Sequence, residues 1–291
     1  MLKLYSIIVC YNPDIFNLKL LCQHIANGGA YVVIVDNTEI SYLLDNPEFD
    51  DFILIPMGEN TGIAHAQNVG IEYAANNGAE VVVFFDQDSI ISDNFLAVLT
   101  GALKTGVPGV VAPVYFDNTK GYEFPSMRLN QHGLLVKVYK KNKNLPYNVD
   151  VVISSGIAAT IVTFEIAGLM DEDFFIDFVD TEWCLRCRKK NVPIHVVPSA
   201  IMTHSIGTSS TKMLFFTLFI HGPDRCYYQI RNCFLLFRKQ SIPQLLAVKE
   251  ITSVLMHWLI LFFFINNKMV YLKNYYLAIS HGIKGVVGKK Q

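Results

Sequence analysis

Two aspartates separated by one residue follow an apolar run in the stretch 81–89, VVVFFDQDS. The run is rich in β-branched and aromatic residues, which is typical of a buried strand in a covered sheet. Side chains alternate along a strand, so Asp86 and Asp88 point to one side and Gln87 to the other. Paired carboxylates repel each other unless a cation or hydrogen-bond donors neutralise them, and their oxygens suit Mg²⁺ or Mn²⁺ beside phosphates. The pattern predicts a site for a metal ion and a diphosphate; a turn, or the cap of a helix starting near Ser92, is the alternative.

Strand and helix patterns alternate before this run and place further polar residues at strand ends. That order is typical of a doubly wound, mostly parallel sheet, in which ligands bind at the carboxyl ends of the strands. Asn12 and Asp36 follow two of the predicted strands, as Asp86 and Asp88 follow a third. This coincidence favours a ligand site over a simple turn. The predicted strands are 4–10, 31–35, 51–55 and 81–85, and the predicted helices are 14–26 and a segment that begins within 60–70 and continues to 75.

The second half of the chain continues the α/β pattern with a polar excursion, predicted to be a loop or hairpin, at 117–148. A helix at 181–190 starts acidic and ends basic, which complements its dipole, and Asp180 is the predicted N-cap. His204 follows the last strand in a Ser/Thr/Gly loop. The other predicted elements are a helix at 93–103, strands at 107–115, 158–164 and 194–197, and helices from 223, at 245–265 and at 269–283.

The composition narrows the class of protein. Of 291 residues 52% are hydrophobic and only 17% are charged, against about 25% in ordinary domains, which favours association with a membrane surface. The net charge of −1 excludes a generally basic nucleic-acid binder. The apolar stretch within 245–265 is shorter than the roughly 20 residues that span a bilayer, so a buried or surface-lying helix is expected. No signal peptide is recognised and the six cysteines are scattered, which indicates reduced thiols in a cytoplasmic protein.

Seven features in a fixed order carry a family resemblance: IIVCYNP, IVDN, NTGIAHAQNVGI, FFDQDS, FFIDFVDTEWCLR, His204 and RCYYQIRN. Together they resemble the family 2 glycosyltransferases with the GT-A fold, and among these the bacterial rhamnosyltransferases that build cell-surface polysaccharides. The resemblance implies a GT-A domain over 1–240, a Rossmann-like, mostly parallel sheet with helices on both faces. The apolar pattern predicts a C-terminal helical segment over 241–291, which packs in the core, on a partner or on the membrane.

The resemblance assigns a nucleotide-sugar donor to the strand ends. A carboxylate at Asp36 can accept a hydrogen bond from the imide N–H of uracil or thymine, although an Asp-Asn turn is the alternative. Asn68 would fix its loop or a ribose hydroxyl, and for Ala64 and Gly70 packing is favoured. Arginines suit diphosphate oxygens, with a surface ion pair left open for one of them. The predicted donor-binding residues are Tyr11, Asn12, Asp36, Asn60, Gly62, Asn68, Asp86, Gln87, Arg225, Tyr228 and Arg231.

The resemblance also assigns the metal ion and the general base. Asp88 and His204 would hold Mg²⁺ or Mn²⁺. Asp180 aligns with the aspartate of the family's Glu-Asp pair, in which Val179 replaces the glutamate. An inverting displacement needs such a carboxylate within hydrogen-bond reach of the acceptor hydroxyl. Asp177 and Glu182 are competing candidates, and capping of the helix is the competing role for Asp180.

The expected reaction is transfer of a deoxyhexose, most plausibly L-rhamnose from dTDP-L-rhamnose, onto a glycan or lipid-linked oligosaccharide. It would take place at the inner face of the bacterial plasma membrane, with the enzyme peripheral on that face. A donor with another UDP- or dTDP-linked sugar is the nearest alternative. A non-catalytic subunit that binds nucleotide sugars or glycans with the same fold is the second alternative, and Val179 is the feature that favours it.

Overall fold

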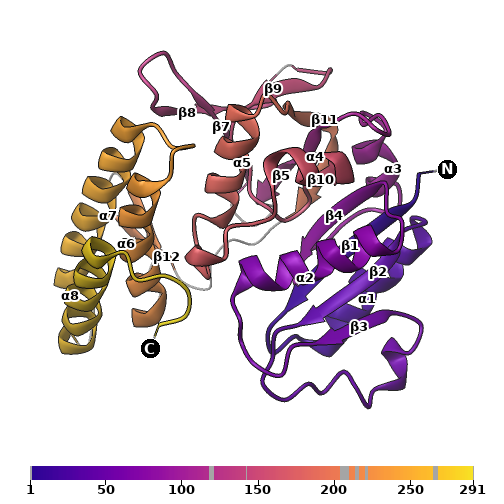
Figure 1. Cartoon of the computed structure of the whole chain (residues 1–291), viewed down its shortest axis with the longest axis horizontal. Helices are drawn as coiled ribbons and strands as arrows, with labels where there is room; N and C mark the ends of the chain where they lie inside the picture. The colour runs from indigo at the N-terminus through magenta and orange to yellow at the C-terminus, as the bar shows by residue number, and fades with distance from the viewer. Residues whose placement is uncertain are drawn as a thin grey trace.

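The computed structural model describes residues 2–117, 121–141, 143–203, 210–213, 216–219, 222–264 and 268–290. Strands β1–β4 and their helices lie on the right of Figure 1, and helices α6, α7 and α8 form a layer on the left. Loop and helix segments of the second half, including α5, lie between these two parts. The candidate site residues are therefore distributed between a sheet and a helical layer that are distant in sequence.

The central sheet has nine strands in the order β3-β2-β1-β4-β10-β5-β11-β9, with β6 beside β5. Strands β3, β2, β1 and β4 are parallel, as are β5 and β11, which confirms the mostly parallel sheet. Strand β10 runs antiparallel to both β4 and β5, and so joins the two parallel groups. The strands are β1 (Leu4–Cys10), β2 (Tyr31–Asp36), β3 (Ile53–Pro56), β4 (Val81–Asp86), β5 (Val110–Asp117), β6 (Tyr122–Phe124), β9 (Tyr147–Val149), β10 (Ala158–Thr160) and β11 (Ile194–Thr203).

Both faces of the sheet are covered, as the continuous apolar runs predict. Ile7 of β1 belongs to one buried cluster and its neighbour Ile8 to another, because successive strand residues face opposite sides. Helix α1 packs in the cluster of Ile8, and α2 and α5 pack in the cluster of Ile7. The helices are α1 (Ile15–Asn27), α2 (Ile63–Asn76), α3 (Phe95–Thr100), α4 (Ile161–Ala167) and α5 (Val179–Lys189), with short 3-10 turns η1 (Pro47–Phe49) and η2 (Glu172–Phe174).

Three predicted elements differ from the observed ones. The predicted strand 158–164 ends at Thr160 and continues as α4, whose buried residues Thr163, Phe164 and Ala167 have helical spacing. The predicted helix 93–103 shortens to α3. Helix α5 begins at Val179 with Phe178 at the N-cap, so Asp180 lies in the first turn and is not the cap. Apolar runs of this length do not by themselves distinguish strand from helix, and in these segments tertiary packing selects the conformation.

The polar excursion contains a hairpin of β7 (Ser126–Leu129) and β8 (Leu135–Val138), as predicted, and β12 (Ser210–Met213) pairs with β13 (Phe216–Phe219). Three helices complete the chain: α6 (Pro223–Arg238), α7 (Gln244–Phe264) and α8 (Lys268–Lys284). Helix α6 contacts both α7 and α8. Within the described part of the chain, no helix combines the length and apolarity needed to cross a membrane.

Candidate active site

The carboxyl ends of β1, β2 and β4 meet at one edge of the sheet. Cys10 pairs with Asp36, and Val9 pairs with Asp86, so both aspartates are level with the end of β1. The chain leaves β1 through Asn12, whose φ of 46° is left-handed and whose N–H donates to Thr38 Oγ1 at 2.9 Å. The parallel register thus gathers the predicted donor residues of three strands.

Asp36 is the most informative residue of this edge. Its side chain is only 1% exposed, and its Oδ1 accepts a hydrogen bond from the Thr38 N–H at 3.1 Å. Its Oδ2 is buried and has no hydrogen-bond partner among the described residues. Buried carboxylate oxygens are normally satisfied, so an orphan acceptor here fits a ligand that brings its own N–H donor. The turn alternative explains one oxygen of Asp36 and leaves the other without a role.

The loop before α2 is held by side-chain amides. Asn37 Oδ1 accepts from the Thr61 N–H at 2.8 Å, and Asn60 Oδ1 accepts from the Gly62 N–H at 3.1 Å. Gly62 has a φ of 88°, and a Cβ there would lie 2.6 Å from the Phe175 ring and 2.7 Å from the Phe175 carbonyl oxygen. Asn60 and Gly62 therefore shape the loop, and Gly62 brings it against residues that precede Asp180.

Two predicted donor-binding residues hold the protein's own backbone. Asn68 is buried; its Nδ2 donates to the Met170 carbonyl at 3.0 Å and its Oδ1 accepts from the Met170 N–H at 2.8 Å, so it fixes a loop and does not face a ribose. Gln87 Oε1 accepts from the Tyr11 N–H at 2.7 Å, and its Nε2 donates to the Tyr11 carbonyl at 3.2 Å. Gln87 therefore joins the end of β4 to the end of β1. A Cβ at Gly70 would lie 2.5 Å from Ile7, as its predicted packing role requires.

The aspartate pair lies in a turn that leaves Asp88 open to a ligand. The Asp86 carbonyl accepts from the Ser89 N–H at 3.0 Å, and the Asp86 N–H donates to Ser155 Oγ at 3.1 Å. The Asp88 side chain is exposed and makes no hydrogen bond to the described residues. Helix α3 starts at Phe95 with Asn94 at its cap, so neither aspartate caps it. The turn alternative is correct for the backbone, while the Asp88 carboxylate stays available.

Carboxylate oxygens at this edge fit a hard divalent cation such as Mg²⁺ or Mn²⁺. Within the described ranges, no group of three or more His, Cys, Asp or Glu side chains is arranged to hold a metal ion. His204, the second predicted ligand, lies outside the described residues. Of the two predicted metal ligands, Asp88 is therefore the one that the described residues include, with an exposed carboxylate beside Asp86.

Asp180 lies in an environment suited to a general base. Burial raises the pKa of Asp180 to about 6, the N–H groups of Thr181 and Ser154 partly oppose this rise, and the charges of Asp177 and Asp86 add to it. The Thr181 N–H lies 2.7 Å from Asp180 Oδ1. Asp180 also lines a largely apolar cavity of about 250 Å³ together with residues of the β7–β8 hairpin, β-bridge segment 151–153 and helices α6 and α7. Of the causes that act on the Asp180 pKa, the charge of Asp86 is the smallest.

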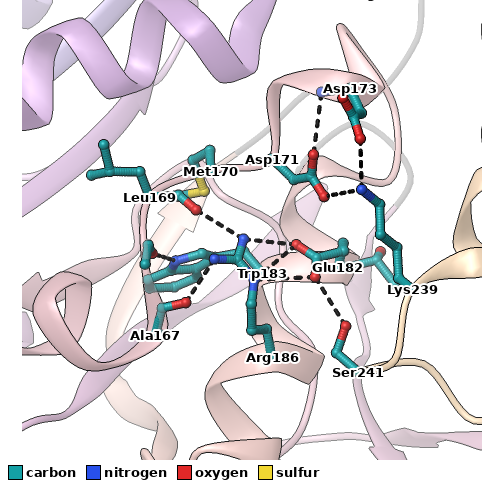
Figure 2. Close-up of polar contacts among 12 residues, drawn as sticks. Ala167, Leu169, Met170, Asp171, Asp173, Glu182, Trp183, Arg186, Lys239 and Ser241 are labelled. Atoms are coloured by element: carbon teal, nitrogen blue, oxygen red, sulfur yellow. Dashed lines mark hydrogen bonds and ion pairs between the residues drawn. The ribbon is translucent and has the colours of Figure 1, made fainter. Parts of the chain in front are cut away.

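The two competing carboxylates are already paired. Asp177 Oδ1 accepts from Arg225 at 2.9 Å. Glu182 is buried, and it accepts from Arg186 at 2.8 Å and from the Ser241 hydroxyl at 2.9 Å, contacts that Figure 2 shows in full. Both carboxylates are engaged by guanidinium groups, whereas Asp180 makes no ion pair among the described residues, so Asp180 stays the candidate. For Arg225 the structure selects the ion-pair alternative.

The motif RCYYQIRN lies on α6, and its residues Tyr228 and Arg231 are buried. Arg231 is fully buried and donates to the carbonyl oxygens of Gly288 at 2.8 Å and Phe174 at 3.2 Å. Tyr228 stacks on the Phe175 ring with centroids 4.8 Å apart, and its hydroxyl accepts from the Lys290 N–H at 2.8 Å. The structure therefore places Arg231 and Tyr228 against the chain's own loop and tail and not at the donor edge. A guanidinium can donate to backbone carbonyl oxygens as well as to phosphates, so the residue type alone does not say which of these Arg231 binds.

Four residues with a structural part in the site were missing from the predicted set: Asn37, Thr38, Ser155 and Asn232. Asn37 and Asn232 stand inside the motifs IVDN and RCYYQIRN, so their positions carried a signal. Thr38 and Ser155 have no such signal, because each acts through contacts with residues remote in sequence.

Comparisons with known proteins agree with this geometry. A family model described as "Glycosyl transferase family 2" matches residues 24–162. The dTDP-rhamnosyl transferase RfbF of Shigella flexneri is 39% identical over 287 residues, covering 98% of this chain and 97% of that protein. The low-salt glycan biosynthesis hexosyltransferase Agl10 of Haloferax volcanii is 25% identical over 302 residues, covering 100% and 94%. The chain belongs to glycosyltransferase family 2, as its motifs indicate.

Solved structures support the fold. S. aureus TarS 1-349 in complex with UDP-GlcNAc matches with a TM-score of 0.57 at 15% identity, covering 98% of this chain and 82% of that one. GalNAc-T7 with UDP, GalNAc and Mn²⁺ matches with a TM-score of 0.58 at 13% identity, covering 84% of this chain and 52% of that one. At such low identity the likeness concerns the fold alone, and it confirms the predicted glycosyltransferase architecture.

Proposed function

We propose that this chain is an inverting, metal-dependent transferase that moves L-rhamnose from dTDP-L-rhamnose onto a glycan or a lipid-linked glycan. The observation that carries the proposal is the position of Asp180 in the lining of a cavity of about 250 Å³, where burial raises its pKa to about 6. The similarity to a dTDP-rhamnosyl transferase over 98% of the chain supports the choice of donor.

The donor would bind at the sheet edge. The orphan Oδ2 of Asp36 would accept the imide N–H of thymine, and the exposed Tyr11 would lie beside the base. Asp88, with Asp86 beside it, would hold a divalent ion. When bound, this ion neutralises the charge that develops on the diphosphate as it leaves.

Asp180 would perform the proton transfer. The acceptor hydroxyl oxygen attacks the anomeric carbon, the bond from that carbon to the diphosphate oxygen breaks, and the hydroxyl proton passes to Asp180. A carboxylate with a pKa of about 6 is a stronger base than an ordinary aspartate and is still ionised at neutral pH. Attack from the face opposite the leaving group inverts the anomeric configuration.

We place the enzyme on an anionic membrane surface through the outer face of α7 and α8. Large apolar side chains there are exposed at helical spacing, and they include Leu245, Val248, Met256 and Leu259 on α7 and Met269, Leu272, Tyr276 and Ile283 on α8. The two helices carry four lysines (Lys249, Lys268, Lys273 and Lys284) against a single acidic residue, Glu250. An apolar surface with flanking lysines suits an interface with anionic lipids, where a lipid-linked acceptor would also lie.

The proposal is tested with the purified full-length chain, Mg²⁺ or Mn²⁺ and a panel of dTDP- and UDP-sugars. We expect dTDP-L-rhamnose to raise the melting temperature most, and to be turned over by transfer to membrane extract or by slow hydrolysis. Stabilisation by a different nucleotide sugar alone would contradict the choice of donor. Binding without turnover of any donor would favour the alternative of a non-catalytic binding subunit, for which Val179 is the supporting feature.

A further inference from the structure

The backbone that leads into Asp180 is held in an unusual conformation. Phe175, Asp177 and Phe178 have φ values of 59°, 63° and 65°, so three of the four residues 175–178 have a positive φ although none is glycine. Bulky residues avoid this region, and a run of them persists only where neighbouring groups determine it. Something outside this loop must therefore hold the path of the chain before Asp180.

Asn232 on α6 is the residue outside this loop that contacts the largest number of its carbonyl oxygens among the described hydrogen bonds. Its Nδ2 lies 2.9 Å from the Phe174 carbonyl oxygen, 2.6 Å from that of Ile176 and 3.0 Å from that of Asp177. The side chain is fully buried, and an amide has only two N–H groups, so the three carbonyls share them. One amide thus contacts three of the four carbonyl oxygens of residues 174–177, and the fourth, that of Phe175, accepts from the Ile63 N–H at 2.7 Å.

The end of the chain completes this support. Arg231, next to Asn232, bonds both the Phe174 carbonyl at 3.2 Å and the Gly288 carbonyl at 2.8 Å. The Gly288 N–H donates in turn to the Asp173 carbonyl at 2.9 Å. The segment after α8 therefore turns back and lies against the loop before α5, which joins the last residues of the chain to the candidate site (Figure 1).

A second set of contacts holds the residues on either side of the loop 174–178. Lys239, just after α6, bonds Asp171 at 2.6 Å and Asp173 at 2.7 Å. Ser241 bonds Glu182, which also pairs with Arg186, so the first turn of α5 is anchored on the far side of Asp180 (Figure 2). The residues before the loop and those after it are therefore both bound to residues 239–241, which follow α6.

We infer that Asn232 is a positioning residue for the reaction: by holding the left-handed loop 174–178, it sets where the Asp180 carboxylate lies relative to the acceptor hydroxyl. The inference rests on the proposed function, in which Asp180 is the base. Asn232 touches no substrate in this scheme. Its effect is therefore expected on the chemical step and on the titration of Asp180, and not on donor binding.

The test is Asn232→Ala in the full-length chain, assayed with dTDP-L-rhamnose and Mn²⁺. We expect kcat to fall about ten- to hundred-fold, because a base displaced by about 1 Å loses that much rate, while the donor Kd changes less than about two-fold. We also expect the rise of kcat with pH to move below the wild-type midpoint near pH 6, because a loosened loop admits water to Asp180. A merely structural role would lower stability and leave that midpoint in place.

Two further variants keep the test decisive. Thr100→Val removes a buried hydrogen bond to the Leu96 carbonyl, far from the loop, and should leave kcat and the pH midpoint unchanged. Arg225→Gln releases Asp177 from the surface side of the loop and decides the matter if Asn232→Ala does not fold; kcat should fall with donor affinity retained.

The outcomes separate the inference from the function on which it rests. A wild-type chain that turns over no donor contradicts the proposed function. An active wild type with an unaltered kcat and pH midpoint in folded Asn232→Ala contradicts the inference alone. If Asn232→Ala does not fold and Arg225→Gln does, an unaltered kcat in Arg225→Gln contradicts the inference.

Discussion

Asp36 and Arg231 are both buried charged side chains in family motifs, yet their surroundings differ. Asp36 keeps one carboxylate oxygen without a partner among the described residues, at an edge where three strands end. Arg231 uses its guanidinium on carbonyl oxygens of the loop before Asp180 and of the chain end. Since buried polar groups are nearly always satisfied, the orphan oxygen of Asp36 fits our proposal of a ligand at this edge, and the satisfied guanidinium of Arg231 fits a structural support.

The same contrast separates two halves of the site. On the donor side the residues lie at strand ends, and the parallel register alone brings them together. On the base side Asp180 depends on α6, on the connection after it and on the last residues of the chain. Substitutions on the donor side should therefore change binding, and those on the base side should change the rate of the chemical step.

The largest expected effect is that of Asp180→Asn. We expect the transfer rate to fall about 10²- to 10⁴-fold, the usual contribution of a general base, while the donor Kd stays within about two-fold. In the wild type the rate should rise with pH through about 6, since only the ionised carboxylate accepts a proton, and the variant should lose that rise. Kinetics from pH 5 to 8 and calorimetric donor titration measure both. Undiminished turnover would remove Asp180 from its role.

Gly62→Ala tests the contact between the two halves. A Cβ at this φ of 88° would lie 2.7 Å from the Phe175 carbonyl oxygen, and backbone cannot move aside as a flexible side chain can. We expect a loss of about 2–4 kcal/mol in the free energy of unfolding, from steric overlap together with backbone strain. Gly58→Ala is the matched control, with a φ of 69° and nothing within 4 Å, and should cost about 1 kcal/mol by strain alone. Equal losses in urea unfolding would show that the two loops do not press on each other.

Asp36→Asn addresses the donor side. An amide at this position would turn either a hydrogen-bond donor or a weaker acceptor towards the thymine ring. Loss of a hydrogen bond to a charged group costs about 1.5–3 kcal/mol. We therefore expect dTDP to bind about ten- to hundred-fold more weakly, with kcat at saturating donor changed little. Calorimetry with dTDP and with UDP measures the loss. Unchanged affinity in the variant would mean that Asp36 Oδ2 does not bind the thymine ring.

The smallest expected effect concerns the outer face of α7. Met256 is 57% exposed. We expect Met256→Asp to weaken binding to vesicles of anionic phospholipid about five- to ten-fold, because the variant loses apolar contact area and adds a negative charge that the lipids repel. Ile166→Asp on α4 is the control, since this exposed isoleucine (41%) belongs to the sheet side of the molecule. Sedimentation with the vesicles measures both variants. Equal binding by Met256→Asp and the wild type would exclude this face as the membrane contact.

Sequence patterns were sufficient where the determinants are local. The alternation of Ile7 and Ile8 and the run 81–85 report a strand covered on both faces, and the polar residue after each strand marks the ligand edge. Asp86, Asp88 and Asp180 are predicted as site residues because the motifs around them are contiguous, and their roles stay predictions. The predicted sheet, helix order and family were confirmed for the same reason.

Tertiary structure decided the roles that depend on distant partners. Asn232 and Arg231 act on Phe174, which lies 58 and 57 positions earlier, and on residues of the chain end; no local pattern states which carbonyl oxygens a buried amide will meet. The motif marked these residues as special without stating why. Their burial and their hydrogen bonds to the loop before Asp180 are properties of the folded chain, and the positioning role that we infer for Asn232 follows from those contacts and not from its residue type.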